Sequence, residues 1–177
     1  MAEHALRAHH DACEIACSPG TPGARLCPEI VGGKYAVEQK VRTATCCCGN
    51  LTAEAIGDPV TVLTCSCEQC QRRTGSAFGV STYWKKENVK LSGEAKCFVR
   101  DGQEGRKISL YFCPNCGSTV YWHSPRRPDG IGIAYGAFVD DELPAPVMSM
   151  WEKRKHSWVI TPGHEHHLEN PPTVPRS

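Results

Sequence analysis

Alternating apolar and polar positions recur along the chain from Lys34 onward and predict short β-strands. A period of two is seen at residues 35–41, 107–112 and 131–135, and β-branched or aromatic runs occupy residues 59–63 and 78–84. Turn sequences such as Gly57-Asp58-Pro59 and Pro128-Asp129-Gly130 separate these segments. No segment after Lys34 shows the helical period of 3.6, so the pattern predicts an all-β domain.

The two ends of the chain differ from the segment between them. Residues 1–33 contain a Pro- and Gly-rich cluster and end in two glycines, and a helix over residues 2–17 would bury little because its apolar positions are mostly Ala. The chain after Trp158 is polar and rich in Pro. We therefore predict a mobile N-terminal extension at 1–33, a β domain at 34–160, and a Pro/His-rich C-terminal tail at 161–177. Three cysteines of the extension lack nearby partners and are expected to be free thiols: Cys13, Cys17 and Cys27.

Composition narrows the class of protein. The 177 residues fit one domain with an extension, and the net charge of +1 gives no global electrostatic reason to bind nucleic acid or a membrane surface. Residues 1–30 lack the apolar run of a signal peptide, and no stretch is long and apolar enough to span a bilayer. Twelve cysteines in such a chain indicate metal ligands rather than disulfides, so we expect a cytoplasmic metalloprotein.

Four of the cysteines form two short pairs that are far apart in the sequence, each followed by glycine. They are C-x-C-G at Cys46 and Cys48, and C-P-x-C-G at Cys113 and Cys116. Two pairs of thiolates suit a closed tetrahedral zinc site, and the glycines let the chain turn so that backbone N–H groups face the sulfurs. A metal joining the pairs would close a long loop and stabilise the fold. The alternative is a set of buried free cysteines.

A second motif, C-x-C-x-x-C, follows the strand predicted at 59–63 and contains Cys65, Cys67 and Cys70. Three thiolates leave a fourth position on zinc open for a thiol or a carbonyl oxygen, which is the pattern of a catalytic site. The sequence offers no fourth ligand at similar spacing. Two more distant residues are considered: we expect Cys97 to be a packed thiol, and His123 follows a strand-like segment. The alternative is a second structural site closed by one of these two residues.

The motif order C-x-C-G, C-x-C-x-x-C-Q-R-R-T-G-S and F-C-P-x-C-G-S resembles the family of glutathione-dependent formaldehyde-activating enzymes, which also includes centromere protein V. The similarity runs from about Lys34 to Trp158, and Cys47 departs from it as a third consecutive cysteine. The resemblance implies a zinc-pinned β-tent (Mss-four-like) fold of short antiparallel strands with two zinc ions per chain. It implies a structural zinc on Cys46, Cys48, Cys113 and Cys116, and a catalytic zinc on Cys65, Cys67 and Cys70.

The same resemblance implies an activity, the joining of glutathione to formaldehyde to give S-(hydroxymethyl)glutathione. We therefore expect a zinc-dependent carbon–sulfur lyase whose partners are a small-molecule thiol, glutathione or a relative, and a small electrophile. Arg72 and Arg73 follow the trio and either pair with carboxylates of the thiol, offset the negative charge of the zinc–thiolate site, or face solvent. Gly75 and Ser76 offer polar donors beside the metal. The rival hypothesis is a non-catalytic two-zinc module that binds protein or nucleic acid, and the neutral net charge argues against nucleic acid.

Overall fold

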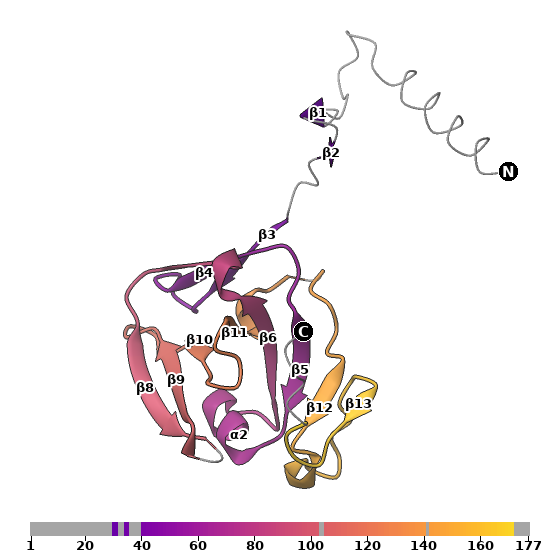
Figure 1. The fold of residues 1–177 in the computed structure, drawn as a ribbon. Coiled ribbons are helices and arrows are strands. Elements are labelled where there is room, and N and C mark those ends of the chain that lie inside the picture. Colours follow the sequence, from indigo (N-terminus) through magenta and orange to yellow (C-terminus); the bar gives the residue numbers. More distant parts are fainter. Residues whose placement is uncertain (1–29, 32–33, 36–39, 103–104, 141, 172–177) are drawn as a thin grey trace, which may run out of the picture. The chain divides into compact units, whose positions relative to one another are not determined.

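The computed structural model describes residues 30–31, 34–35, 40–102, 105–140 and 142–171 (Figure 1). The chain divides into two units, Met1–Glu38 and Gln39–Ser177. In the first unit, β1 (Ile30–Val31) pairs antiparallel with β2 (Lys34–Tyr35). The remainder of the predicted extension, including its three cysteines, lies outside the described residues, so its mobility and its boundary stay predictions.

Two sheets form the second unit (Figure 1). The large sheet has eight strands, in the order β13 (Glu165–His166), β12 (Met148–Met150), β5 (Thr61–Cys65), β6 (Gly79–Lys85), β11 (Gly130–Ala134), β10 (Thr119–His123), β9 (Lys107–Phe112) and β8 (Lys96–Asp101). Neighbouring strands are antiparallel, except that β12 runs parallel to both β5 and β13. The small sheet is antiparallel, in the order β3 (Val41–Thr45), β4 (Thr52–Ile56) and β7 (Val89–Ser92).

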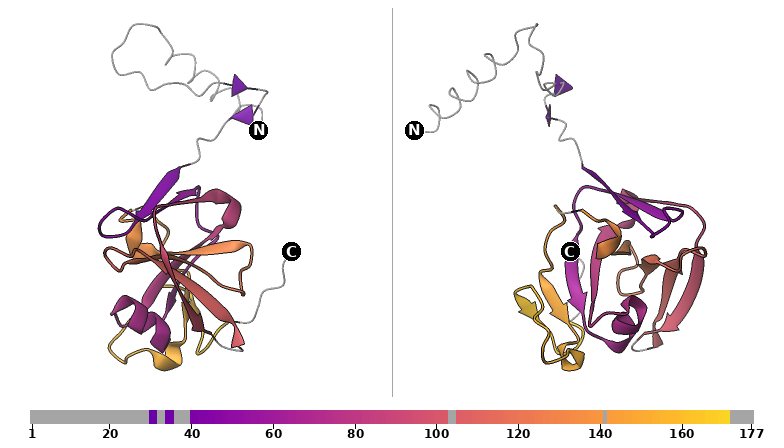
Figure 2. Two further views of the ribbon diagram at one scale, coloured as in Figure 1. Left: turned by 90° about the vertical axis from the view of Figure 1, so that its left-hand side faces the viewer. Right: turned by 180° about the vertical axis from the view of Figure 1, so that it is seen from behind.

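Helices are few and short in the part of the chain that the structure describes. The α-helix α2 (Glu68–Thr74) follows β5, and three single-turn 3-10 helices lie in connections: η1 (Lys86–Asn88), η3 (Tyr135–Ala137) and η4 (Glu152–Arg154). The views in Figures 1 and 2 place the small sheet across one end of the large sheet and α2 at the other end. The mostly β character is therefore confirmed, with one short helix that the sequence pattern did not predict. Its seven residues include no buried side chain, so it has no apolar face that a period of 3.6 could reveal.

The hydrophobic core lies between the two sheets. Ala44, Ala53 and Ala55 of the small sheet are fully buried against large-sheet residues that include Trp84 and Ile133. Alanines on the inner face of β3 and β4 let the backbone of the small sheet approach these larger side chains closely. The core thus depends on contact between the two sheets, and any link between them would stabilise it.

Strand β3 reverses the usual roles of apolar and polar residues. Val41 is 57% exposed, whereas Arg42 is only 6% exposed and points inward. The Arg42 guanidinium pairs with Asp58 at 2.8 Å and with Asp140 at 2.7 Å, and its Nε donates to the Gly57 carbonyl. A buried charge is tolerated only when it is paired and hydrogen-bonded, and these carboxylates meet that condition.

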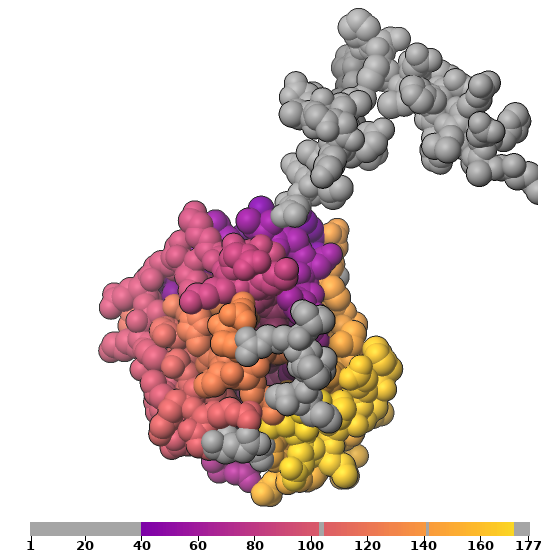
Figure 3. All heavy atoms as spheres, viewed as in Figure 1, coloured from indigo at the N-terminus to yellow at the C-terminus, as the bar shows by residue number. Residues whose placement is uncertain are grey.

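The chain beyond residue 160, where the composition predicts a tail, contributes β13 to the edge of the large sheet. Glu152 binds this segment through two hydrogen bonds. It accepts one from Thr161 and one from His166 Nδ1, the latter at 2.8 Å. Although burial opposes ionisation, hydrogen bonds from His166, Ser149 and Thr161 lower the pKa of Glu152 to about 2. Figure 3 shows the segment, in yellow, packed onto the domain. Strand pairing uses backbone groups that every residue carries, so polar composition does not reveal it.

Over the residues that the structure describes, no helix has the length and hydropathy needed to cross a bilayer.

Candidate functional site

The structure brings the two distant cysteine pairs together. Cys46 and Cys48 lie in the turn between β3 and β4, and Cys113 and Cys116 lie in the turn between β9 and β10, so the cluster connects the small sheet to the large one. All four sulfurs lie within 4.8 Å of one another. The Cys46–Cys48 and Cys48–Cys113 sulfur distances are 3.5 and 3.6 Å. Four sulfurs placed tetrahedrally about 2.3 Å from zinc would be about 3.8 Å apart, so the cluster fits this metal.

Both turns depend on a glycine, and the first also places a backbone donor on a ligand sulfur. Gly49 and Gly117 have φ angles of 79° and 74°, in the left-handed region that favours glycine. The Leu51 N–H donates to the Cys46 sulfur at 3.2 Å. Although burial opposes ionisation, this bond and the neighbouring thiols lower the pKa of Cys46. These donors stabilise thiolates in the way that ligation of a metal requires.

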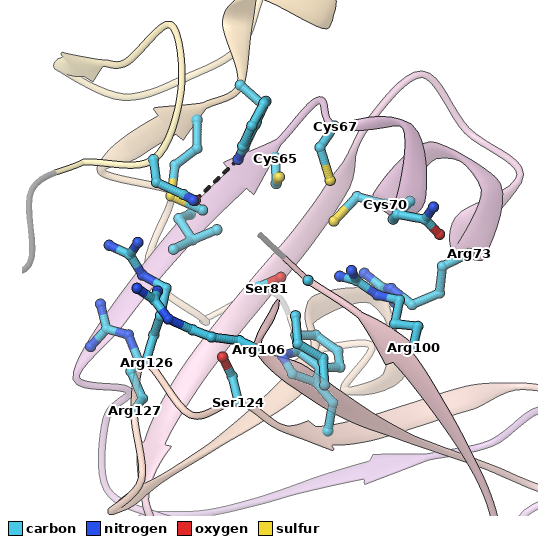
Figure 4. A pocket seen from close by; sticks show the side chains of 18 of the residues that line it. Cys65, Cys67, Cys70, Arg73, Ser81, Arg100, Arg106, Ser124, Arg126 and Arg127 are labelled. Atoms are coloured by element: carbon cyan, nitrogen blue, oxygen red, sulfur yellow. Dashed lines mark hydrogen bonds between the residues drawn. The ribbon is translucent and has the colours of Figure 1, made fainter. Parts of the chain in front are cut away.

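The trio forms a second, separate cluster. Cys65 ends β5, Cys67 directly precedes α2, and Cys70 lies in the first turn of that helix. The backbone N–H groups of Cys70 and Gln71 both donate to the Cys67 carbonyl at 3.0 Å, which fixes the turn between the sulfurs. The three sulfurs lie within 4.8 Å of one another and face the same space (Figure 4). Three soft sulfur ligands in this arrangement suit zinc.

No fourth histidine, cysteine or carboxylate joins this trio within the described residues. His123 lies on β10, where its ring packs edge-on against Tyr111 and Tyr121. Cys97, which we expected to be packed, is exposed, because it lies on β8 at the edge of the large sheet. Neither of the two residues considered as closing ligands therefore takes that role here.

Hydrogen bonding distributes charge unevenly over the trio. Hydrogen bonds from Cys65 and then Cys70 lower the pKa of Cys67 to about 2, and the Arg100 charge adds to this lowering. The hydrogen bond with Cys67, that with Cys70, and burial raise the pKa of Cys65. Among the three sulfurs, the surroundings therefore favour the thiolate form most at Cys67, between the strand and the helix.

A cavity of about 430 Å³ adjoins the trio. Apolar side chains from β5, β9 and β12, such as Leu63, Leu110 and Met148, form part of its wall. Its charged lining is strongly cationic, with two carboxylates, Glu68 and Asp101, against six arginines: Arg73, Arg100, Arg106, Arg126, Arg127 and Arg154. The near-neutral net charge of the chain thus conceals a local concentration of positive charge next to the cysteines.

Arg73 is held beside the trio by aromatic packing. Its guanidinium lies 4.6 Å from the centroid of the Trp122 ring, a cation–π geometry. Trp122 can occupy this place because it passes Gly132 closely: a Cβ atom there would lie 2.1 Å from the indole nitrogen. That nitrogen donates to the Tyr83 hydroxyl at 3.3 Å. Figure 4 shows Arg73 and Arg100 on the Cys70 side of the cavity.

The other predicted thiol-binding residues are placed differently. Arg72 lies on the outside of α2, where its side chain is 70% exposed and pairs with Glu68 at 3.6 Å. Arg72, Gly75 and Ser76 do not line the cavity, so only Arg73 of the predicted four does. The sequence analysis missed the other five arginines, which come from β8, from the position directly before β9, from the β10–β11 turn and from η4. The one signal available in the sequence is the doublet at Arg126 and Arg127, set between two prolines.

Comparison with known protein families gave one match. Residues 41–154 match the family model described as glutathione-dependent formaldehyde-activating enzyme, which covers more than half of the chain. A search of curated proteins found no match. Among solved structures, the chain is similar to the crystal structure of a Rhodobacter sphaeroides protein, with 16% sequence identity and a TM-score of 0.44. That match covers 58% of this chain and 90% of the other.

Proposed function

The chain belongs to the family of glutathione-dependent formaldehyde-activating enzymes, and from this premise we propose that it is a zinc-dependent carbon–sulfur lyase. Its substrates are adducts of glutathione, or a related thiol, with formaldehyde or another small electrophile. The observation that carries the proposal is a three-cysteine cluster that opens onto a cavity lined by arginines. We also assign the domain to the β-tent fold that the family implies.

The two clusters have different roles in this proposal. Cys46, Cys48, Cys113 and Cys116 hold a structural zinc, because they close on one another and do not line the cavity. Cys65, Cys67 and Cys70 hold the zinc that takes part in chemistry. That ion would supply Lewis acidity at a coordination position that three protein ligands leave open.

The residues of the chain bind and orient the thiol. Glutathione carries two carboxylates, and arginine pairs with carboxylates through two parallel hydrogen bonds. Arg73 and Arg100 are the nearest candidates, since both line the cavity on the Cys70 side of the trio and the charge of Arg100 adds to the lowering of the Cys67 pKa. A guanidinium that acts electrostatically on these sulfurs also favours the thiolate form of a substrate sulfur placed next to them.

The overall reaction balances without an oxidant or a reductant. One sulfur–carbon bond forms, the carbonyl π bond of the aldehyde breaks, and the thiol proton ends on the former carbonyl oxygen. The reverse direction breaks the same bond and returns the proton to sulfur. The contribution of the cavity is proximity: it holds thiol and electrophile together and so lowers the entropic part of the barrier.

Exchange NMR of formaldehyde with glutathione, with and without the zinc-loaded protein, tests the proposal. We expect accelerated exchange with the wild-type chain and with Cys97→Ser, which changes an exposed thiol outside both clusters. We expect none with Cys67→Ser. If no common low-molecular-weight thiol is accelerated by a protein that holds two zinc ions, the non-catalytic module becomes the better description.

A further inference from the structure

Three of the cavity arginines are grouped apart from the trio. Arg126 and Arg127 lie in the turn between β10 and β11, and Arg106 directly precedes β9. Figure 4 shows them gathered on the Ser124 side of the cavity, whereas Arg73 and Arg100 lie on the Cys70 side. We call Arg106, Arg126 and Arg127 the distal arginines.

Two of the distal arginines are held in place by contacts other than ion pairs with carboxylates. The Arg127 guanidinium lies 4.8 Å from the centroid of the Tyr83 ring, and Arg126 donates to the Pro171 carbonyl at 2.8 Å. Within the described part of the chain, neither Arg126 nor Arg127 forms an ion pair with a carboxylate. Burial and then the charges of Arg106 and Arg127 lower the pKa of Arg126. Like charges that are held together in this way attract an anion.

Two stacked contacts relate the distal arginines to the trio. Arg73 sits over Trp122 and Arg127 sits over Tyr83, and these two rings meet edge-on with centroids 6.2 Å apart. The aromatic pair therefore separates a guanidinium beside the cysteines from one farther along the cavity. An extended tripeptide spans about 10 Å, so a ligand of that size reaches beyond the trio.

We propose that the distal arginines form a second anion subsite, which makes the cavity select thiols that carry an anionic group remote from sulfur. This inference rests on the proposed function, because it assumes that the thiol binds at the trio. The remote group is a carboxylate or a phosphate, since arginine recognises both through the same paired donors. A thiol whose only carboxylate is close to sulfur is served by Arg73 and Arg100 alone and binds more weakly.

Calorimetric titration of the zinc-loaded protein with four thiols tests the subsite. Glutathione carries a carboxylate remote from sulfur, and coenzyme A carries remote phosphates. Glutathione monoethyl ester lacks the charge on the glycine carboxylate. N-acetylcysteine carries a single carboxylate, close to sulfur. We expect glutathione or coenzyme A to bind at least about tenfold more tightly than N-acetylcysteine. A preference for glutathione over its ester identifies carboxylate as the remote group, and a preference for coenzyme A identifies phosphate.

Substitutions test whether the distal arginines cause the preference for thiols with a remote anionic group. Arg126→Gln and Arg127→Gln, singly and together, should remove this preference while leaving the dissociation constant of N-acetylcysteine within about twofold of the wild-type value. Lys90→Gln is the control matched in charge, since Lys90 lies on β7 in the small sheet and pairs with Glu54. Zinc content and melting temperature, measured on each variant, verify that the fold is intact.

Each outcome decides between the two hypotheses. Two results would overturn the subsite and leave the proposed function standing, provided that the thiols bind and exchange is accelerated. In one, the double variant keeps the wild-type preference for thiols with a remote anionic group. In the other, the wild-type protein shows no such preference. If no thiol binds and exchange is not accelerated, both are overturned.

Discussion

The two cysteine clusters use the same ligand atom but draw it from different parts of the chain. The four-cysteine cluster combines two turns, and Cys48 and Cys113 meet across a sequence separation of 65 residues. The trio comes from one short stretch in which Cys65 ends a strand and Cys70 belongs to the following helix. The first cluster connects two sheets and lines no part of the cavity, whereas the second lines it.

Under the proposed function, this difference separates what each metal would do for the molecule. A metal that bridges distant turns would bind only the folded chain, so its binding free energy would stabilise the contact between the two faces of the core. A metal bound by one strand–helix junction would close only a small loop and add little to the fold, and its position beside the arginines would give it access to a ligand. Variants that remove one ligand from each cluster should therefore behave differently.

The largest effect is expected in the four-cysteine cluster. Cys113→Ser and Cys116→Ser should leave no soluble folded protein, because zinc binding contributes about 10–16 kcal/mol in finger peptides, which is comparable to the roughly 5–15 kcal/mol of stability that a native domain has. Soluble yield, circular dichroism and zinc content measure this. Cys97→Ser, outside both clusters, is the control and should behave as wild type. Normal yield with an unchanged melting curve in both variants would remove the structural role.

In the trio, the same substitution should separate activity from stability. Cys67→Ser should lower the exchange rate by at least about a hundredfold and reduce the zinc content from two ions to one. The melting temperature should fall by only a few degrees, because β5 and α2 keep their backbone hydrogen bonds. Zinc analysis and calorimetry on the same sample test both parts. A zinc content unaffected by the change would show that the trio does not hold the second ion.

Sequence reasoning reached the two clusters more easily than the cavity, for a physical reason. Cysteine spacing within a turn is a local property, so pairs such as Cys113 and Cys116 can be recognised from the sequence, and strands such as β6 and β9 follow from their alternation or β-branched runs. Arg100 and Arg126 share a cavity only because β8, β9 and β10 pair in that order. Nothing in the sequence beside either residue records that pairing.

Helix α2 illustrates the same limit at short range. Arg72 and Arg73 are neighbours in the sequence and were predicted to act together, but successive residues of a helix point about 100° apart. Arg73 consequently reaches Trp122 and the cavity, while Arg72 pairs with Glu68 at the surface. The unpredicted helix is thus the reason that one of the two arginines is placed away from the site.

A smaller effect is expected when these two arginines are compared. Arg73→Gln should raise KM for glutathione by about tenfold with little change in kcat, because it removes a contact made equally by bound substrate and transition state. Arg72→Gln should change KM by less than about twofold, since it removes only an exposed ion pair. Steady-state kinetics on the two variants makes the comparison. Equal effects would mean that the thiol also contacts the outer face of α2.

The smallest effect, close to zero, is expected when residues 1–33 are removed. The comparison of the two clusters assumes that neither takes a ligand from Cys13, Cys17 or Cys27, which lie outside the described residues. The apolar positions of residues 2–17 are mostly Ala, and the following residues are rich in Pro and Gly, so we expect the removal of this segment to expose little apolar surface. The shortened chain should bind two zinc ions and melt within about two degrees of the full chain, as measured by metal analysis and calorimetry. A lost zinc ion would identify the extension as the source of a missing ligand, and the cluster that lost it would be the one to which that ligand belongs.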